Sequence, residues 1–131
     1  MYIFALFYNI KMNGMFNKLI IKNFKSIIDL TIDLGRVNVF IGANGMGKSN
    51  VLEAIAMIAA NSQNEIDLNK LVQAGVRIAR PDLMRSSFYG KKATDNIEIC
   101  LSGYGIENSY LIAPKDKDYV MTPWTVDVKC K

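Results

Sequence analysis

The feature that most constrains this 131-residue chain is a cluster of three glycines in residues 42–49, which read GANGMGKS. Glycine has no Cβ atom, so the backbone at these positions can wrap closely around a ligand. A short β-branched run, VNVFI at residues 37–41, precedes the cluster, and residues 48–60 after it are rich in helix formers. The sequence therefore predicts a buried central strand, a tight loop and a helix in succession.

The spacing Gly-x4-Gly-Lys-Ser is the Walker A pattern of phosphate-binding loops. Backbone N–H groups of such a loop, and the partial positive charge of the helix that follows, suit the phosphates of a nucleoside triphosphate. Lys48 is expected to reach the β and γ phosphates, and the Ser49 hydroxyl to bind Mg²⁺. The alternative is a chance match, which average residue frequencies produce in about one chain of this length in a few hundred. The strand before the loop and the helix after it favour a real site.

The helix expected at residues 48–60 should be buried on nearly all sides, because beyond its first turn Glu53 is its only charged residue. Asp67 is expected to cap a second, short helix that ends at Ala74, with Gly75 in the left-handed position after it. Pro81 and the aspartate that follows are expected to open another helical turn.

Apolar and polar residues alternate in residues 18–24 and 28–34, which predicts two antiparallel strands with one solvated face. A similar alternation begins again at Ile97 and continues to Val128. It predicts an antiparallel meander, with Pro123 confined to the edge or the end of a strand.

The amino-acid composition excludes several kinds of catalytic and metal-binding site. The chain has no histidine, which removes Ser-His-Asp triads, Cys-His pairs and histidine-ligated metals. A net charge of +4 is compatible with polyanionic ligands and identifies none. Cys100 and Cys130 are far apart in sequence, so neither a zinc site nor a disulfide framework is expected, and a reducing cytoplasm fits best.

Residues 1–16 are expected to be an N-terminal extension, because the regular pattern starts only near Phe16. The apolar start, MYIFALFYNI, is shorter than the roughly 20 residues of a membrane span and lacks the features of a signal peptide. We therefore expect no membrane partner.

Three segments together resemble the N-terminus of ABC-type ATPases: IKNFKS at residues 21–26, IGANGMGKSN at 41–50 and LEAI at 52–55. The resemblance is strongest to the chromosome-maintenance and recombination group, which includes the RecF and SMC proteins, and to OLD-like or AAA-labelled ATPases of bacterial defence. It implies a mixed α/β fold, the N-terminal lobe of a P-loop ATPase head over residues 17–131, with antiparallel strands around a P-loop strand–helix unit. It also implies ATP and Mg²⁺ as ligands, and a head that dimerises around two ATP molecules.

The resemblance carries a set of nucleotide-site residues onto this chain. Lys25 and Ser26 match the end of the first strand, and they are expected either near the nucleotide or in an exposed turn. The candidate binding set, with Ser49 as the metal ligand, is Asn44, Gly45, Met46, Gly47, Lys48, Ser49 and Asn50.

Parts that hydrolysis requires in such ATPases are missing from the sequence. No apolar run ends in Asp-Glu, which is the Walker B pattern that holds magnesium and orients the attacking water. Residues 101–105, LSGYG, only superficially resemble the LSGG signature and are interpreted as a hairpin turn. We therefore expect the N-terminal lobe of a longer ATPase, which alone binds nucleotide without turnover.

Residues 74–92 are the most basic part of the chain, and they are interpreted either as a contact for a phosphate-rich partner such as nucleic acid or as a solvated connector. Two functions remain open. One is an ATPase head that acts in DNA maintenance or bacterial defence. The other is a non-hydrolysing module that recruits a partner chain carrying the Walker B and signature motifs. A small kinase is disfavoured, because the strands before the loop match ABC-type heads.

Overall fold

The computed structural model describes residues 16–86, 96–116 and 120–130. Its helices are α2 (Lys48–Ala59), α3 (Leu68–Gln73) and α4 (Pro81–Met84). Its strands are β1 (Lys18–Phe24), β2 (Ile27–Asp33), β3 (Asn61–Ser62), β4 (Glu65–Ile66), β5 (Ile97–Gly103), β6 (Ile106–Pro114) and β7 (Trp124–Cys130).

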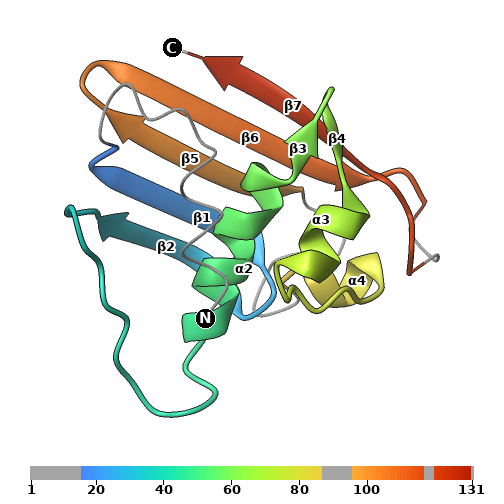
Figure 1. The fold of residues 1–131 in the computed structure, drawn as a ribbon, viewed down its shortest axis with the longest axis horizontal. Helices are drawn as coiled ribbons and strands as arrows, with labels where there is room; N and C mark the ends of the chain where they lie inside the picture. Colours follow the sequence, from blue (N-terminus) through green and yellow to red (C-terminus); the bar gives the residue numbers. More distant parts are fainter. Residues whose placement is uncertain (1–15, 87–95, 117–119, 131) are drawn as a thin grey trace.

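The strands form one antiparallel sheet in the order β2-β1-β5-β6-β7-β4-β3, and the helices lie on one of its faces (Figure 1). The expected mixed α/β class with antiparallel strands is therefore confirmed. The hairpin β1–β2, the hairpin β5–β6 and the strand β7 correspond to the segments in which the sequence alternates. Pro123 immediately precedes β7, at an end, as expected.

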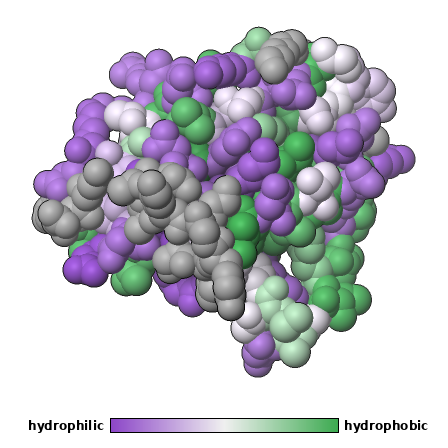
Figure 2. Space-filling view, turned by 180° about the vertical axis from the view of Figure 1, so that it is seen from behind, coloured by the Kyte–Doolittle hydropathy of each residue, from purple (hydrophilic) through white to green (hydrophobic). Residues whose placement is uncertain are grey.

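The alternation in the strands separates a covered face from a solvated one. Leu19 and Ile21 of β1 pair with Leu101 and Ile99 of β5 and point toward the helices. The opposite face carries charged residues, including Lys22, which forms an ion pair with Glu98 at 3.8 Å. Figure 2 looks at the molecule from behind, and polar side chains make up much of the surface it shows.

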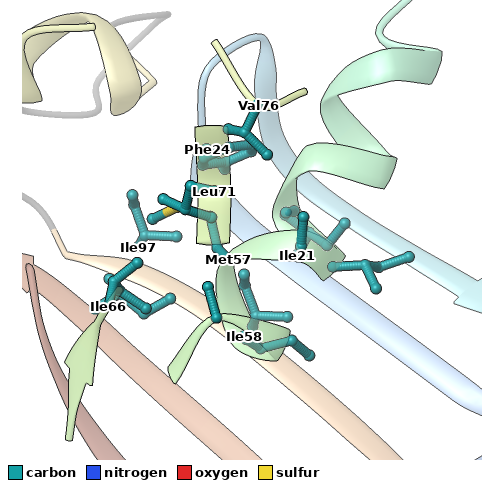
Figure 3. Close-up of a cluster of buried hydrophobic side chains, with 14 of the residues drawn as sticks. Ile21, Phe24, Met57, Ile58, Ile66, Leu71, Val76 and Ile97 are labelled. Carbon is teal, nitrogen blue, oxygen red and sulfur yellow. The ribbon is translucent and has the colours of Figure 1, made fainter. Parts of the chain in front are cut away.

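The hydrophobic core lies between this sheet and the helices α2 and α3 (Figure 3). Ile21 and Ile97 of the sheet meet Met57 and Ile58 of α2 and Leu71 of α3. Within α2 every residue from Glu53 to Ile58 is buried, which confirms the expected burial of this helix on nearly all sides.

The ends of the short helices agree with the sequence prediction. The Asp67 carboxylate accepts hydrogen bonds from the backbone N–H groups of Asn69 and Lys70 at the start of α3. Ala74 is the C-cap of that helix, one residue past its end at Gln73, and Gly75 follows it at φ +78°. Pro81 is the first residue of α4.

Two tight turns contain residues with positive φ, one between β5 and β6 and one between β3 and β4. Tyr104 and Gly105, both at positive φ, join β5 to β6, so the LSGYG segment is the hairpin turn that was expected. The polar residues 61–64 separate α2 from α3 and, with residues 65–66, form a small hairpin, β3–β4, in which Gln63 and Asn64 adopt left-handed conformations.

The prediction of a buried central strand at residues 37–41 is wrong. This segment forms no strand, and the exposed fractions of Val37, Val39 and Ile41 are 76%, 75% and 91%. The reason is that no strand in the described ranges pairs with it, so its backbone groups have no sheet partner. Residues 34–47 form a long loop outside the sheet (Figure 1) and project from the body of the molecule, at the lower right of Figure 2.

The N-terminal extension expected at residues 1–16 lies almost entirely outside the described residues. Phe16, its last member, packs against the core. Within the described ranges, no helix has both the length and the apolar character to cross a membrane.

Candidate functional site

The start of helix α2 offers unsatisfied backbone donors. Gly47 precedes the helix at φ +84°, and no side chain caps its first turn. The first turn also contains no acidic residue. Because the first N–H groups of a helix have no partner within it, they point toward the loop of residues 42–47 and are available to an anion.

The loop itself is open. Gly45 has φ +85°, and a Cβ atom built on it would have no heavy atom within 4 Å. Its neighbours Asn44 and Met46 are exposed as well. The loop is therefore accessible to a polyphosphate chain, although the backbone N–H of Met46 donates within the loop to the oxygen of Ala43 at 3.4 Å.

Lys48 folds back across the loop. Its ammonium group donates hydrogen bonds to the backbone oxygens of Gly42 and Ala43, at 2.5 and 2.6 Å. The ammonium group that is expected at the phosphates thus lies beside the first residues of the loop. It is held by two neutral carbonyl groups that a charged phosphate can replace as the partner.

Ser26 and Asn50 fasten the end of the loop to the sheet. The Asn50 side chain donates to Ser26 Oγ at 2.6 Å, and a Cβ atom on Gly47 would approach the same oxygen to 3.2 Å. Ser26 therefore lies beside the last glycine of the loop, and whether it is near a bound nucleotide stays a prediction. Asn50 serves as the link between α2 and the turn that follows β1.

Two cavities flank the first turns of α2. One, of about 420 Å³, is lined by Lys25, Ser26 and Asn50 together with residues of the segment 77–85. The other, of about 230 Å³, is lined by Ser49 and other residues of α2 and by residues 74–77, which follow α3. Neither is lined by Lys48, so the site that the sequence predicts is the exposed loop rather than an enclosed pocket.

Lys25 lies in the turn between β1 and β2, but its side chain is not exposed. Its side chain is 12% exposed and forms an ion pair with Glu53 of α2. Glu53 also accepts a hydrogen bond from Arg77 Nε at 3.1 Å. Sequence reasoning missed this cluster, although Glu53 signalled it as the lone charge on an otherwise apolar stretch of helix.

The basic segment 74–92 is less free than its charge suggests. In its described part Arg77 pairs with Glu53, Arg80 pairs with Asp82 at 2.8 Å, and Arg85 is buried. Lys91 and Lys92 lie outside the described residues. Arg77 thus ties the segment to α2, whereas the Arg80 pair lies within the segment, so its described part is more than a solvated connector.

The residues at this loop fit a magnesium nucleotide. An open glycine backbone, an uncapped helix start and the Lys48 ammonium supply donors for phosphate oxygens. The exposed Ser49 supplies one hydroxyl oxygen for Mg²⁺, a cation that prefers oxygen ligands and is often bound jointly by protein and phosphate groups.

Comparison with known proteins identifies the family to which the chain belongs. Neither the curated proteins nor the solved structures gave a significant match. A protein-family model described as AAA ATPase domain matches residues 15–122, which include the loop, the helices α2, α3 and α4, and the cluster of Lys25, Glu53 and Arg77. The match covers most of the sequence, and the chain therefore belongs to the AAA ATPase domain family.

Proposed function

We propose that this chain binds ATP with Mg²⁺ at residues 44–50, as part of an ATPase that acts in the cytoplasm in DNA maintenance or bacterial defence. In this proposal the amides of Asn44, Gly45, Met46 and Gly47 surround the phosphates, and Lys48 neutralises their charge. Ser49 binds Mg²⁺, and Asn50 keeps the loop in register with the sheet. The family match supports nucleotide binding, and the resemblance of residues 19–60 supports the biological setting.

The observation that carries the proposal is the first turn of α2. It begins at a left-handed glycine, has no side-chain cap and has Lys48 beside it. A helix start without a cap leaves several N–H groups that only water or a ligand can satisfy. An anion is the ligand that satisfies them best, because the helix dipole adds to the lysine charge.

A second candidate function is a non-hydrolysing module that recruits the missing half of the site from a partner. The exposed apolar side chains of Val37, Val39 and Ile41 favour it. A strand from a partner chain would cover them and supply the sheet partners that this segment lacks. In such an assembly a second head, or a chain with Walker B and signature motifs, would complete the site, and nucleic acid could bind the resulting dimer.

Titration of magnesium-ATP during urea unfolding tests the binding proposal. Ligand at a hundred times its dissociation constant should raise the free energy of unfolding by about 2.7 kcal/mol. Lys48→Ala should remove this gain, because it deletes the charge at the phosphates. Lys129→Ala is the matched control, since it removes the same charge from an exposed position on β7.

Comparison of the wild type with Lys48→Ala and Lys129→Ala shows whether magnesium-ATP binds at the loop. A gain in the wild type and in Lys129→Ala, but not in Lys48→Ala, supports binding at the loop. A folded wild type that magnesium-ATP does not stabilise, or an equal gain in all three proteins, contradicts the proposal. Release of inorganic phosphate, measured in parallel, distinguishes hydrolysis from the non-hydrolysing alternative.

A further inference from the structure

Glu53 is a buried carboxylate held between two cations. Its side chain is only 8% exposed, and it lies on α2 a little more than one turn after Lys48. Its two oxygens accept from different residues, Oε2 from Lys25 and Oε1 from Arg77. A buried carboxylate is stable only when it is paired, so each of these contacts constrains the position of its partner.

Lys25 extends the cluster to the segment after α3. Its ammonium group also donates to the backbone oxygen of Arg77 at 3.1 Å, and its backbone N–H donates to the oxygen of Met84 at 2.9 Å. The turn after β1, helix α2 and the segment 77–84 are thus joined through one lysine and one glutamate. Lys25 adopts φ +49°, which is uncommon for a residue with a side chain, and these contacts hold it there.

Arg77 has donor capacity to spare. It uses Nε for Glu53, and within the described ranges its two terminal nitrogens have no partner. Its side chain is 73% exposed and borders both cavities, one shared with Ser26 and Asn50 and the other with Ser49. Two cations against one carboxylate also leave the cluster with one net positive charge beside the start of α2.

We propose that Glu53 is a positioning residue for the nucleotide site. By holding Arg77 through Nε, it directs the two terminal nitrogens of the guanidinium toward a polar or anionic group of the ligand bound at the loop. Lys25 remains in the interior and fixes the backbone that carries Arg77. This inference rests on the proposed nucleotide binding at residues 44–50 and adds Arg77 as a contact to the same ligand, with Glu53 acting through Arg77.

The experiment is a double-mutant cycle in the affinity for magnesium-ATP, measured by isothermal titration calorimetry on the full chain. Arg77→Met removes a charge-assisted hydrogen bond to the ligand and should weaken binding about tenfold. Glu53→Gln keeps the shape but removes the charge that orients Arg77, and it should weaken binding by a similar factor. The double variant should be no weaker than Arg77→Met alone, because Glu53 acts through Arg77.

Two control variants make the same substitutions, Glu to Gln and Arg to Met, at positions away from the proposed site. Glu98→Gln changes a glutamate paired with Lys22 on the far face of the sheet, and Arg80→Met changes a neighbouring arginine that lines neither cavity. Both should bind magnesium-ATP like the wild type. A purely structural role of Glu53 would lower stability, and it would not produce the non-additive loss of affinity.

The outcomes distinguish this inference from the binding proposal. If the wild type binds and Lys48→Ala does not, but Arg77→Met binds like the wild type, the inference is overturned while the binding proposal stands. Losses that multiply to about a hundredfold in the double variant also overturn it. If the wild type does not bind at all, both fail. Should Glu53→Gln not fold, the exposed Arg77→Met still decides, because an unchanged affinity contradicts a ligand contact.

Discussion

Replacing Gly47 by alanine should cost more folding free energy than the same change at Gly45, although the two glycines have nearly identical backbones. Their φ angles are +84° and +85°, so alanine pays a similar conformational cost of about 1–2 kcal/mol at both positions. At Gly45 the new methyl group meets nothing within 4 Å, but at Gly47 it approaches Ser26 Oγ to 3.2 Å. Ser26 cannot move freely, because it accepts the 2.6 Å hydrogen bond from Asn50.

The expected difference follows from that hydrogen bond. Displacing Ser26 loses or weakens it, which is worth about 0.5–1.5 kcal/mol. We therefore expect Gly47→Ala to lower the free energy of unfolding by about 2–3 kcal/mol and Gly45→Ala by about 1–2 kcal/mol. Urea unfolding followed by circular dichroism measures both values.

A third substitution isolates the cause. In a Ser26→Ala background the obstructing oxygen and its hydrogen bond are absent, so the two glycine variants should become equal. If Gly47→Ala and Gly45→Ala lower the free energy of unfolding equally in the native background, Ser26 does not obstruct the new methyl group at position 47. A difference that persists after Ser26→Ala would show that it arises elsewhere in the loop, and either result refutes the reasoning.

Two further predictions concern stability. Ile21→Ala, in the core, should lower the free energy of unfolding by about 2–5 kcal/mol. Ile41→Ala should change it by less than about 0.5 kcal/mol, because the Ile41 side chain is 91% exposed. A large loss for Ile41→Ala in urea unfolding would mean that residues 37–41 are buried. Burial raises the pKa of the Cys100 thiol, so the neutral thiol contributes stability that is complete below its unfolded pKa of about 8.5 and is lost as the pH rises through the folded value. Unfolding at pH 7 and at higher pH should therefore show a smaller decline for Cys100→Ala than for the wild type, and identical pH profiles would contradict it.

Local signals in the sequence predicted most of the elements. The cap at Asp67, the left-handed Gly75 and the proline that begins α4 act through contacts with near neighbours in the chain. Alternation likewise located β1, β2 and β5–β7. The order of the strands was beyond such reasoning, because the pairing of β1 with β5 joins segments about eighty residues apart and depends on which faces must be buried together.

In the candidate site, too, the sequence predicted the features that depend on neighbouring residues and missed those that join distant segments. The glycine spacing alone located the open loop and the start of α2, because the requirements for wrapping a phosphate are local. The cluster of Lys25, Glu53 and Arg77 joins three segments that are distant in sequence, and only its buried charge was visible beforehand. A lone charged residue within an apolar helix indicates that a partner exists, but it does not identify that partner.

The segment 37–41 is where pattern and structure disagree, and the disagreement bears on function. Its β-branched residues have the pattern of a buried strand, yet a strand is stable only with a neighbour to accept its backbone hydrogen bonds, and the described residues provide none. The candidate phosphate-binding loop is therefore anchored by hydrogen bonds on its helix side, through Lys48, Asn50 and Ser26. On its strand side Phe40 packs against the core, but no described strand pairs with the backbone. If a nucleotide that binds here has to fix this unpaired backbone, the cost of fixing it weakens the nucleotide's affinity. Under the second candidate function, a partner strand that pairs with this segment would remove that cost and tighten nucleotide binding. By reciprocity, the nucleotide would tighten the partner's binding by the same factor.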